Sequence, residues 1–191
     1  EYTRILTSTR AYRLSSVPNE TNREDEVLYS RRIPVPLSVE QTAFSLLRVR
    51  SESLYGRMDE GLDVLSRIVR QFVVARQDDE GTEVSDFSGT IPKSLFMMNS
   101  EQMNGLPDVG LDFEAEPLAL LDQIYLTTLS RHPTPEEEFV IGNHLAATPP
   151  LPPDWYQALK RRNDGTLPPR LQAALDVYWA LINSAEFTYN H

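Results

Sequence analysis

Side chains that could bind a metal are scattered through this sequence of 191 residues. Its three histidines are His132, His144 and His191, and none belongs to an H-E-x-x-H or similar pattern that would present zinc ligands on one helix face. The acidic stretch from Asp78 to Phe87 lacks the alternating oxygen ligands and the terminal glutamate of a calcium loop. The residues therefore predict no metal site.

Motifs for nucleophilic or phosphate chemistry are also absent from the sequence. It contains no G-x-S-x-G nucleophile elbow, no Walker loop and no G-x-G-x-x-G turn. The absence of cysteine excludes thiolate catalysis, zinc–thiolate sites and covalent haem attachment within this chain. Carboxylate pairs such as Asp59 with Asp63 carry little information in a chain with 28 Asp and Glu. No catalytic residue is predicted, and a chain without its own active site is favoured over an enzyme.

Two segments remain as candidates for binding. Lys160–Arg162 is the densest basic cluster, and Trp155 and Tyr156 lie directly upstream of it. This pattern is typical either of an anion-binding or protein-docking patch or of a solvated helix end. The polar stretch 15–36 either binds a ligand or, as we favour, satisfies its own backbone through side chains that include Asn22.

The composition is that of an acidic globular chain, with 40% apolar residues and a formal net charge of −10. Neutralising phosphates needs a concentrated basic surface, and 18 Lys and Arg are outnumbered by 28 Asp and Glu, so no nucleic acid is expected as a partner. No stretch approaches the ~20 apolar residues of a bilayer span. The first residues, Glu1–Arg4, lack the features of a signal peptide. No membrane span is expected in this chain.

Helix start signals organise the sequence. Ser38 with Gln41, and Thr134 with Glu137, have the spacing of a capping box, in which each side chain bonds a free backbone donor of the first helical turn. Apolar residues recur every three or four positions, as on one face of a helix. They predict helices at 39–50, 57–76, 114–131, 135–147 and from 169 to the C-terminus, a short helix opened by 89–92, and the tail of a helix at 2–14.

The expected fold is all-α, since no convincing β-alternation occurs in the sequence. We predict a single helical domain over residues 1–191, an irregular multi-helix bundle of about six helices with long polar and proline-rich loops. The proline-rich run 148–153 cannot continue a helix and favours an extended connection. Residues 148–168 are therefore a candidate hinge.

Six segments occur in an order and spacing that resemble one known family. They are ILTSTRAYRLSS at 5–16, LSVEQ at 37–41, GTIP at 89–92, LFMMNS at 95–100, YLTTLSR at 125–131 and WALINSAEF at 179–187. Together they look like domain of unknown function 1553, a family abundant in planctomycete bacteria. The family's recurring polar positions match Ser8, Arg10, Tyr12, Ser15, Ser16, Asn99, Arg131, Asn183, Glu186 and His191. The family has no established reaction, so the resemblance implies no catalytic residue.

The resemblance also implies a setting for the chain. Members of the family are exported multidomain proteins, so an extracytoplasmic location, periplasmic or at the cell surface, is expected. A companion domain of unknown function commonly lies upstream, often with a cytochrome c-like haem domain and sometimes with a carbohydrate-binding module. This chain would be the C-terminal portion of the family domain. No cofactor is expected in the chain itself, and a haem domain would lie elsewhere in the parent protein.

The leading functional hypothesis is a non-catalytic helical module that assembles or presents the neighbouring domains of its parent protein. One alternative is part of a hydrolase or redox-linked enzyme acting on polysaccharide, with Glu186, His191 or the acidic loop contributing. Another is glycan binding without catalysis, through Trp155 and Tyr156. The residues expected to take part in binding are Arg10, Asn99, Arg131, Trp155, Tyr156, Glu186 and His191.

Overall fold

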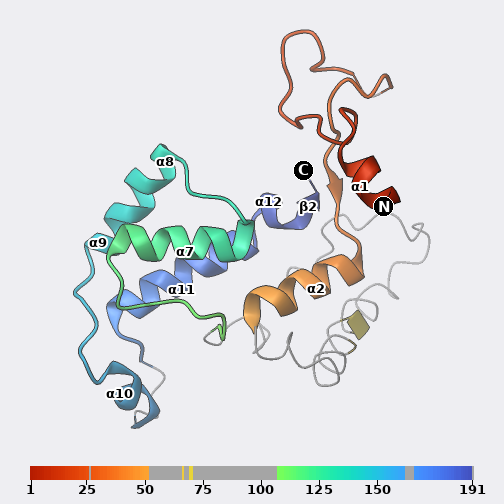
Figure 1. Cartoon of the computed structure of the whole chain (residues 1–191). Coiled ribbons are helices and arrows are strands. Elements are labelled where there is room, and N and C mark those ends of the chain that lie inside the picture. Colours follow the sequence, from red (N-terminus) through yellow and green to blue (C-terminus); the bar gives the residue numbers. More distant parts are fainter. Residues whose placement is uncertain (26, 52–65, 67–68, 71–106, 162–165, 191) are drawn as a thin grey trace, which may run out of the picture.

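A computed structural model describes residues 1–25, 27–51, 66, 69–70, 107–161 and 166–190 (Figure 1). Their architecture is helical, and the predicted all-α class is confirmed. The helix expected at 57–76, apart from the helical positions 66, 69 and 70, and the short helix opened by 89–92 lie outside the described residues. No helix in the described ranges is both long and apolar enough to cross a lipid bilayer.

The N-terminal helix is shorter than predicted. Helix α1 spans Tyr2–Thr7, and the sequence-based expectation of a helix reaching Leu14 is wrong. The hydroxyl of Ser8 donates to the Arg4 carbonyl at 2.6 Å, and that of Thr9 donates to the Leu6 carbonyl at 2.8 Å. Such side-chain bonds compete with the continuing helical ladder, which explains why the helix ends here. Turns and a long loop follow, and we call residues 1–34 the arm.

The arm joins the body through a short antiparallel ladder and helix α2. Strand β1 (Val35–Pro36) pairs with β2 (Tyr189–Asn190), so the start of the body lies beside the C-terminal end (Figure 1). Helix α2 (Val39–Arg50) begins at the predicted capping box. Gln41 N–H donates to the Ser38 hydroxyl at 3.2 Å, and Ser38 N–H donates to the Gln41 side chain at 2.9 Å. This local prediction is confirmed.

The core forms where α7 (Pro117–Leu129) and α11 (Pro169–Ile182) pack against each other and against α2. The Tyr178 hydroxyl of α11 is buried and donates to the Val49 carbonyl near the end of α2. Burial of this hydroxyl raises its pKa. The largest fully buried side chains are Leu46, Leu120, Leu121, Ile124, Tyr125, Leu145, Leu171, Tyr178 and Ile182.

A continuous helical stretch after α7 contains a π-helical segment. It comprises α8 (Pro135–Glu137), η1 (Glu138–Gly142) and α9 (Asn143–Ala146), close to the helix predicted at 135–147. The Thr134 capping box is present, as predicted. Gly142 is buried against α7: a Cβ atom on it would lie 2.7 Å from Cδ2 of Leu118.

The proline-rich region contains a helix that the sequence pattern did not predict. Within the candidate hinge at 148–168, α10 spans Trp155–Arg161. The Trp155 indole N–H donates to the Glu114 carboxylate at 2.9 Å, and its ring meets Phe113 edge-on with centroids 6.1 Å apart. These contacts tie α10 to the segment that precedes α7.

The last helix is broken in two, where one continuous helix is expected from the apolar spacing. Helix α11 ends at Ile182, and α12 covers Ala185–Thr188. The Asn183 side-chain amide donates to the Trp179 carbonyl at 2.8 Å, and the Ser184 hydroxyl accepts from Phe187 N–H at 3.2 Å. These two polar side chains close one helix and cap the next, because both bond backbone groups at a helix end.

Candidate functional site

The polar cluster with the densest bonding is centred on Arg131, which lies just beyond the end of α7. Its guanidinium is side-on to Glu186 of α12, with Nε–Oε1 2.6 Å and Nη2–Oε2 2.8 Å. It is end-on to Glu137 of α8, with Nη1–Oε2 2.8 Å and Nη2–Oε1 2.9 Å. Nη1 also donates to the carbonyl of His132 at 3.0 Å. We call Arg131, Glu137 and Glu186 the arginine clasp.

All five N–H donors of Arg131 are used within the chain. A guanidinium has five such donors, and the five bonds just described account for them. Glu186, a residue expected to take part in binding, is thereby engaged by another such residue. The geometry joins the ends of three helices, and the guanidinium keeps no donor for a ligand.

The charges in the arginine clasp shift the pKa values of its members. Hydrogen bonds from Arg131 lower the pKa of Glu137 to about 2, and the two carboxylates raise the pKa of Arg131 above its ordinary value. The Arg131 guanidinium also lies over the Tyr125 ring, 5.1 Å from the centroid. Burial, followed by the nearby charge of Glu137, raises the pKa of Tyr125 to about 12. At neutral pH Glu137 and Arg131 are therefore an ionised pair.

The two aromatic candidates on α10 are placed differently. Trp155 is half-buried and bonded to Glu114, whereas Tyr156 is 47% exposed. The Lys160 ammonium lies 4.5 Å from the centroid of the Tyr156 ring. Beside them is an apolar cavity of about 240 Å³. Its walls are Pro149, Pro150, Pro152, Trp155, Ala158, Leu159, Thr166, Pro168 and Pro169.

The sequence pattern predicts only that the prolines of this cavity interrupt helices. Prolines on both sides of α10 come together around Trp155, and only the three-dimensional course of the chain shows it. No local signal in the sequence reports this convergence, since the two proline groups are separated by the helix and by residues 162–165. The basic cluster Lys160–Arg162 lies only partly within the described residues.

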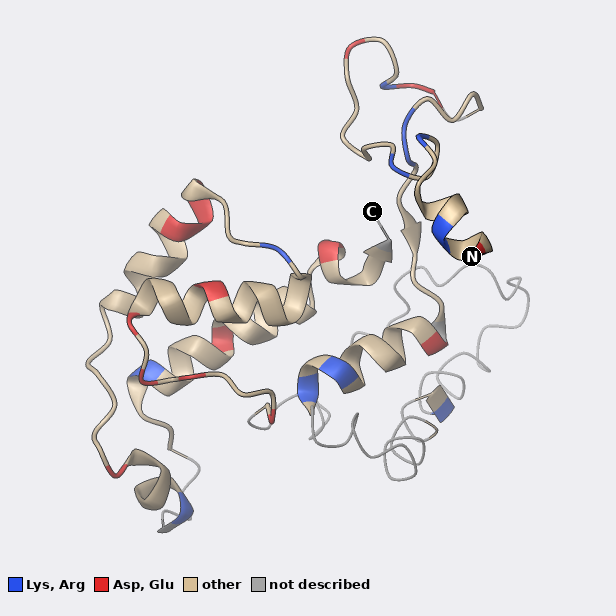
Figure 2. Cartoon of the chain, in the orientation of Figure 1, with Lys and Arg blue, Asp and Glu red and all other residues tan. Residues whose placement is uncertain are grey.

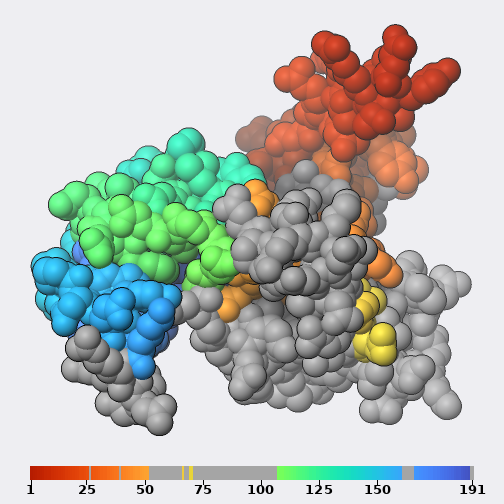
Figure 3. Space-filling model, turned by 60° about the horizontal axis from the view of Figure 1, so that its bottom comes forward, coloured from red at the N-terminus to blue at the C-terminus, as the bar shows by residue number. Residues whose placement is uncertain are grey.

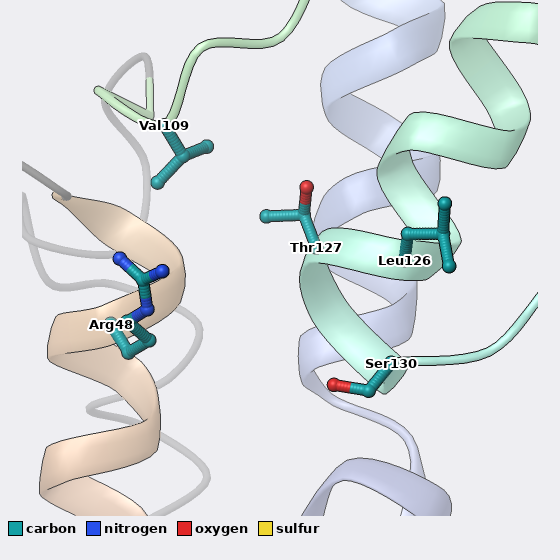
Figure 4. Close-up of a pocket in the computed structure, with 5 residues that line it drawn as sticks. All are labelled: Arg48, Val109, Leu126, Thr127 and Ser130. Atoms are coloured by element: carbon teal, nitrogen blue, oxygen red, sulfur yellow. The ribbon is translucent and has the colours of Figure 1, made fainter.

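A second cavity, of about 340 Å³, lies between α2 and the end of α7 (Figure 4). It is lined by Arg48, Val109, Leu126, Thr127 and Ser130. The side chains of Arg48, Thr127 and Ser130 bring polar atoms toward this space from two helices (Figure 4). Ser130 has φ 56°, the left-handed conformation that ends α7. No pattern in the sequence predicts this cavity, because its two walls are distant in the sequence.

The remaining expected binding residues do not converge with the arginine clasp. Arg10 lies exposed in the arm, and among the described residues its side chain has no hydrogen-bond or ion-pair partner. Asn99 and His191 lie outside the described residues. Among the shared positions that the structure describes, Arg131 and Glu186 are brought into direct contact by a bond between their side chains.

The polar loop of the arm bonds its own backbone, as the sequence favours. Asn19 Oδ1 accepts from the backbone N–H groups of Thr21 and Asn22 at 2.9 and 3.0 Å. The Asp25 carboxylate accepts from the N–H groups of residues 27, 28 and 30 and from the Ser30 hydroxyl. These bonds, with the Ser30 hydroxyl contributing most, lower the pKa of Asp25 to about 2.

No group of three or more histidine, aspartate or glutamate side chains is arranged to hold a metal ion in the part of the chain that is described. Comparison with known proteins gives no match: no family model, no curated protein and no solved structure resembles the chain closely enough to be matched. The similarity to domain of unknown function 1553 stays a prediction from the sequence segments alone.

Proposed function

We propose that this chain is a helical interaction module that assembles with other protein surfaces through its arm. The observation that supports it is a series of exposed large apolar side chains, with exposed fractions from 54% at Tyr12 to 86% at Tyr2. The members in the arm are Tyr2, Ile5, Leu6, Tyr12, Val17, Val27, Leu28 and Tyr29. So many exposed large apolar side chains within one segment favour a protein interaction site.

The local geometry of the arm favours docking as a unit. Tyr2, Ile5 and Leu6 have the i, i+3, i+4 spacing that places them on one face of α1. Burying one such side chain stabilises a complex by roughly 1.5–3 kcal/mol before ordering costs. The arm stands away from the body in the space-filling view (Figure 3). A partner could therefore reach it without displacing the core.

The partners we propose are protein surfaces, neighbouring domains of an exported, extracytoplasmic parent protein among them. The arginine clasp supports a non-catalytic role, because its guanidinium donors and Glu186 are already bonded within the chain. The family resemblance implies a haem domain or other cofactor domain elsewhere in the parent protein. In this proposal the module positions that domain and does not contain it.

A photo-crosslinking residue in the arm tests this function in the full-length protein. Replacing Leu6 with a photoreactive amino acid is expected to give protein adducts, since its side chain would be covered in the assembled state. Gln172 on α11, exposed and polar, is the matched control position. Equal adduct yields at Leu6 and Gln172 would contradict the proposal.

A second candidate function is glycan binding at α10. It is favoured by one observation, the exposed Tyr156 ring next to the apolar cavity of about 240 Å³. Exposed aromatic rings of this kind present an apolar body with a polar tip. Tyr156→Ala is expected to weaken binding to a glycan panel, whereas Gln157→Ala beside it is the control. No binding by the unaltered chain to any glycan of the panel would remove this candidate.

A further inference from the structure

The arm as a whole is close to neutral, with six arginines and five acidic residues, but residues 2–17, which we call the basic arm segment, have a charge opposite to that of the chain as a whole. Residues 2–17 contain Arg4, Arg10 and Arg13 and no aspartate or glutamate, in a chain of net charge −10. The arginines alternate with the apolar residues of the same segment, such as Leu6 on α1. The surface that fits the arm should therefore be acidic and apolar at once.

The body of the chain offers such a surface on α7, α8 and η1. Phe139 is 73% exposed, Val140 67% and Leu118 56%. Glu136 and Glu138 precede Phe139 and Val140 in the chain, and neither makes an ion pair with any described residue. We call Leu118, Glu136, Glu138, Phe139 and Val140 the acidic patch.

Two local features shape the acidic patch. Phe139 and Val140 are neighbours in the π-helical segment η1, and segments of this type occur frequently at functional sites. The missing side chain of Gly142 lets Leu118 lie against η1, so that apolar groups of two elements adjoin. Acidic residues occupy the first turns of α8 and η1, which are coloured red in Figure 2.

The cations of the surrounding segment do not neutralise this surface. Between residues 108 and 140 the chain has eight carboxylates, one arginine (Arg131) and one histidine (His132), whose ring lies against Asp122. Arg131 is committed to Glu137 and Glu186 in the arginine clasp. The acidic patch therefore keeps the negative charge that the arginines of residues 2–17 would complement.

We propose that the arm of one copy docks on the acidic patch of a second copy. This inference rests on the proposed function and names one partner for the same arm. Within one copy the arm and α8 lie on either side of α12, well apart (Figure 1). Two copies can each place an arm on the other's patch, which gives a closed dimer with two equivalent contacts. The pairing buries apolar side chains of both surfaces and brings opposite charges together.

Two charge-reversal variants test the pairing. The arm variant Arg4→Glu, Arg10→Glu, Arg13→Glu places an acidic arm opposite an acidic patch. The patch variant Glu136→Lys, Glu138→Lys places the basic arm segment opposite a basic patch. Each variant alone is expected to raise the dimer dissociation constant by at least about tenfold, measured by sedimentation equilibrium.

The mixture of the two variants separates docking from misfolding. In a mixed dimer each acidic arm meets a basic patch and each basic arm segment meets an acidic patch, so dimerisation is expected to return. Asp176→Lys, a charge reversal on α11, is the control that should leave the dimer unchanged. A monomer at all concentrations, or a mixture that stays monomeric, would overturn the inference.

Crosslinking from Leu6 distinguishes this inference from the function on which it rests. With a mixture of isotopically light and heavy copies, adducts between a light arm and heavy residues 114–140 are the expected result. Adducts to another domain, or only within one copy, would overturn self-docking, and the first of these would still support an interaction module. If no adduct forms at all, both the self-docking inference and the proposed interaction function are overturned.

Discussion

Arg131 and Glu186, 55 residues apart in the sequence, are joined by two parallel hydrogen bonds of 2.6 and 2.8 Å. The same guanidinium reaches Glu137, so one side chain holds together the end of α7, the start of α8 and helix α12. The side chains of all three are about one-third exposed. Solvent screening therefore reduces the strength of the clasp, but its several bonds act together.

Removing the guanidinium is expected to destabilise the chain moderately. Arg131→Met should lower the free energy of unfolding by about 1–3 kcal/mol, because two carboxylates lose their partner and face each other. Urea denaturation measures this change. A double-mutant cycle with Glu186→Gln should give a coupling energy above about 0.5 kcal/mol. A coupling energy near zero would show that the ion pair contributes no stability.

The arginine clasp also predicts an acid-sensitive contribution to stability. The pKa of Glu137 falls from 4.5 to about 2 on folding, so its ionised form stabilises the folded state above pH 4.5. This stability is lost as the pH falls from 4.5 towards 2. Glu137→Gln should therefore flatten the decrease of the melting temperature in that range. Identical pH profiles for the two proteins, measured by circular dichroism, would contradict the assignment.

The buried hydroxyl of Tyr178 should be important for stability. Tyr178→Phe leaves the Val49 carbonyl without this donor in the core between α11 and α2, which should cost about 1–3 kcal/mol. Tyr156→Phe is the matched control, since that ring is 47% exposed. Chemical denaturation of both variants should show a loss only for Tyr178. Equal stabilities would mean that the buried hydroxyl bond has no net effect.

Two glycines should respond differently to alanine. Gly110 has φ +67° with open space around it, so Gly110→Ala should cost about 1 kcal/mol through backbone strain alone. At Gly142 the one close contact of the new Cβ would be with Cδ2 of Leu118, the end of a side chain that is 56% exposed and can rotate, while Leu121 Cδ2 would lie at an ordinary 4.0 Å. Gly142→Ala should therefore be milder. Thermal denaturation giving the reverse order would show that η1 cannot adjust.

Features decided within a few residues were predictable from the sequence. The capping boxes at Ser38 and Thr134 are confirmed, because each needs only a side chain and a backbone group three residues apart. The lengths of α1 and α11 were overestimated. Apolar spacing continues past Thr7 and Ile182, but local hydroxyl and amide side chains there bond the backbone and end the helices.

By itself the sequence determined the all-α class and the main helix starts. These depend on residue type, spacing and composition, which act over one or two helical turns. Only the tertiary structure decided that Arg131 meets Glu186, that Tyr178 reaches Val49, and that prolines on both sides of α10 enclose a cavity. Those contacts join residues far apart in the chain, and packing of the helices, which no local pattern encodes, brings them together.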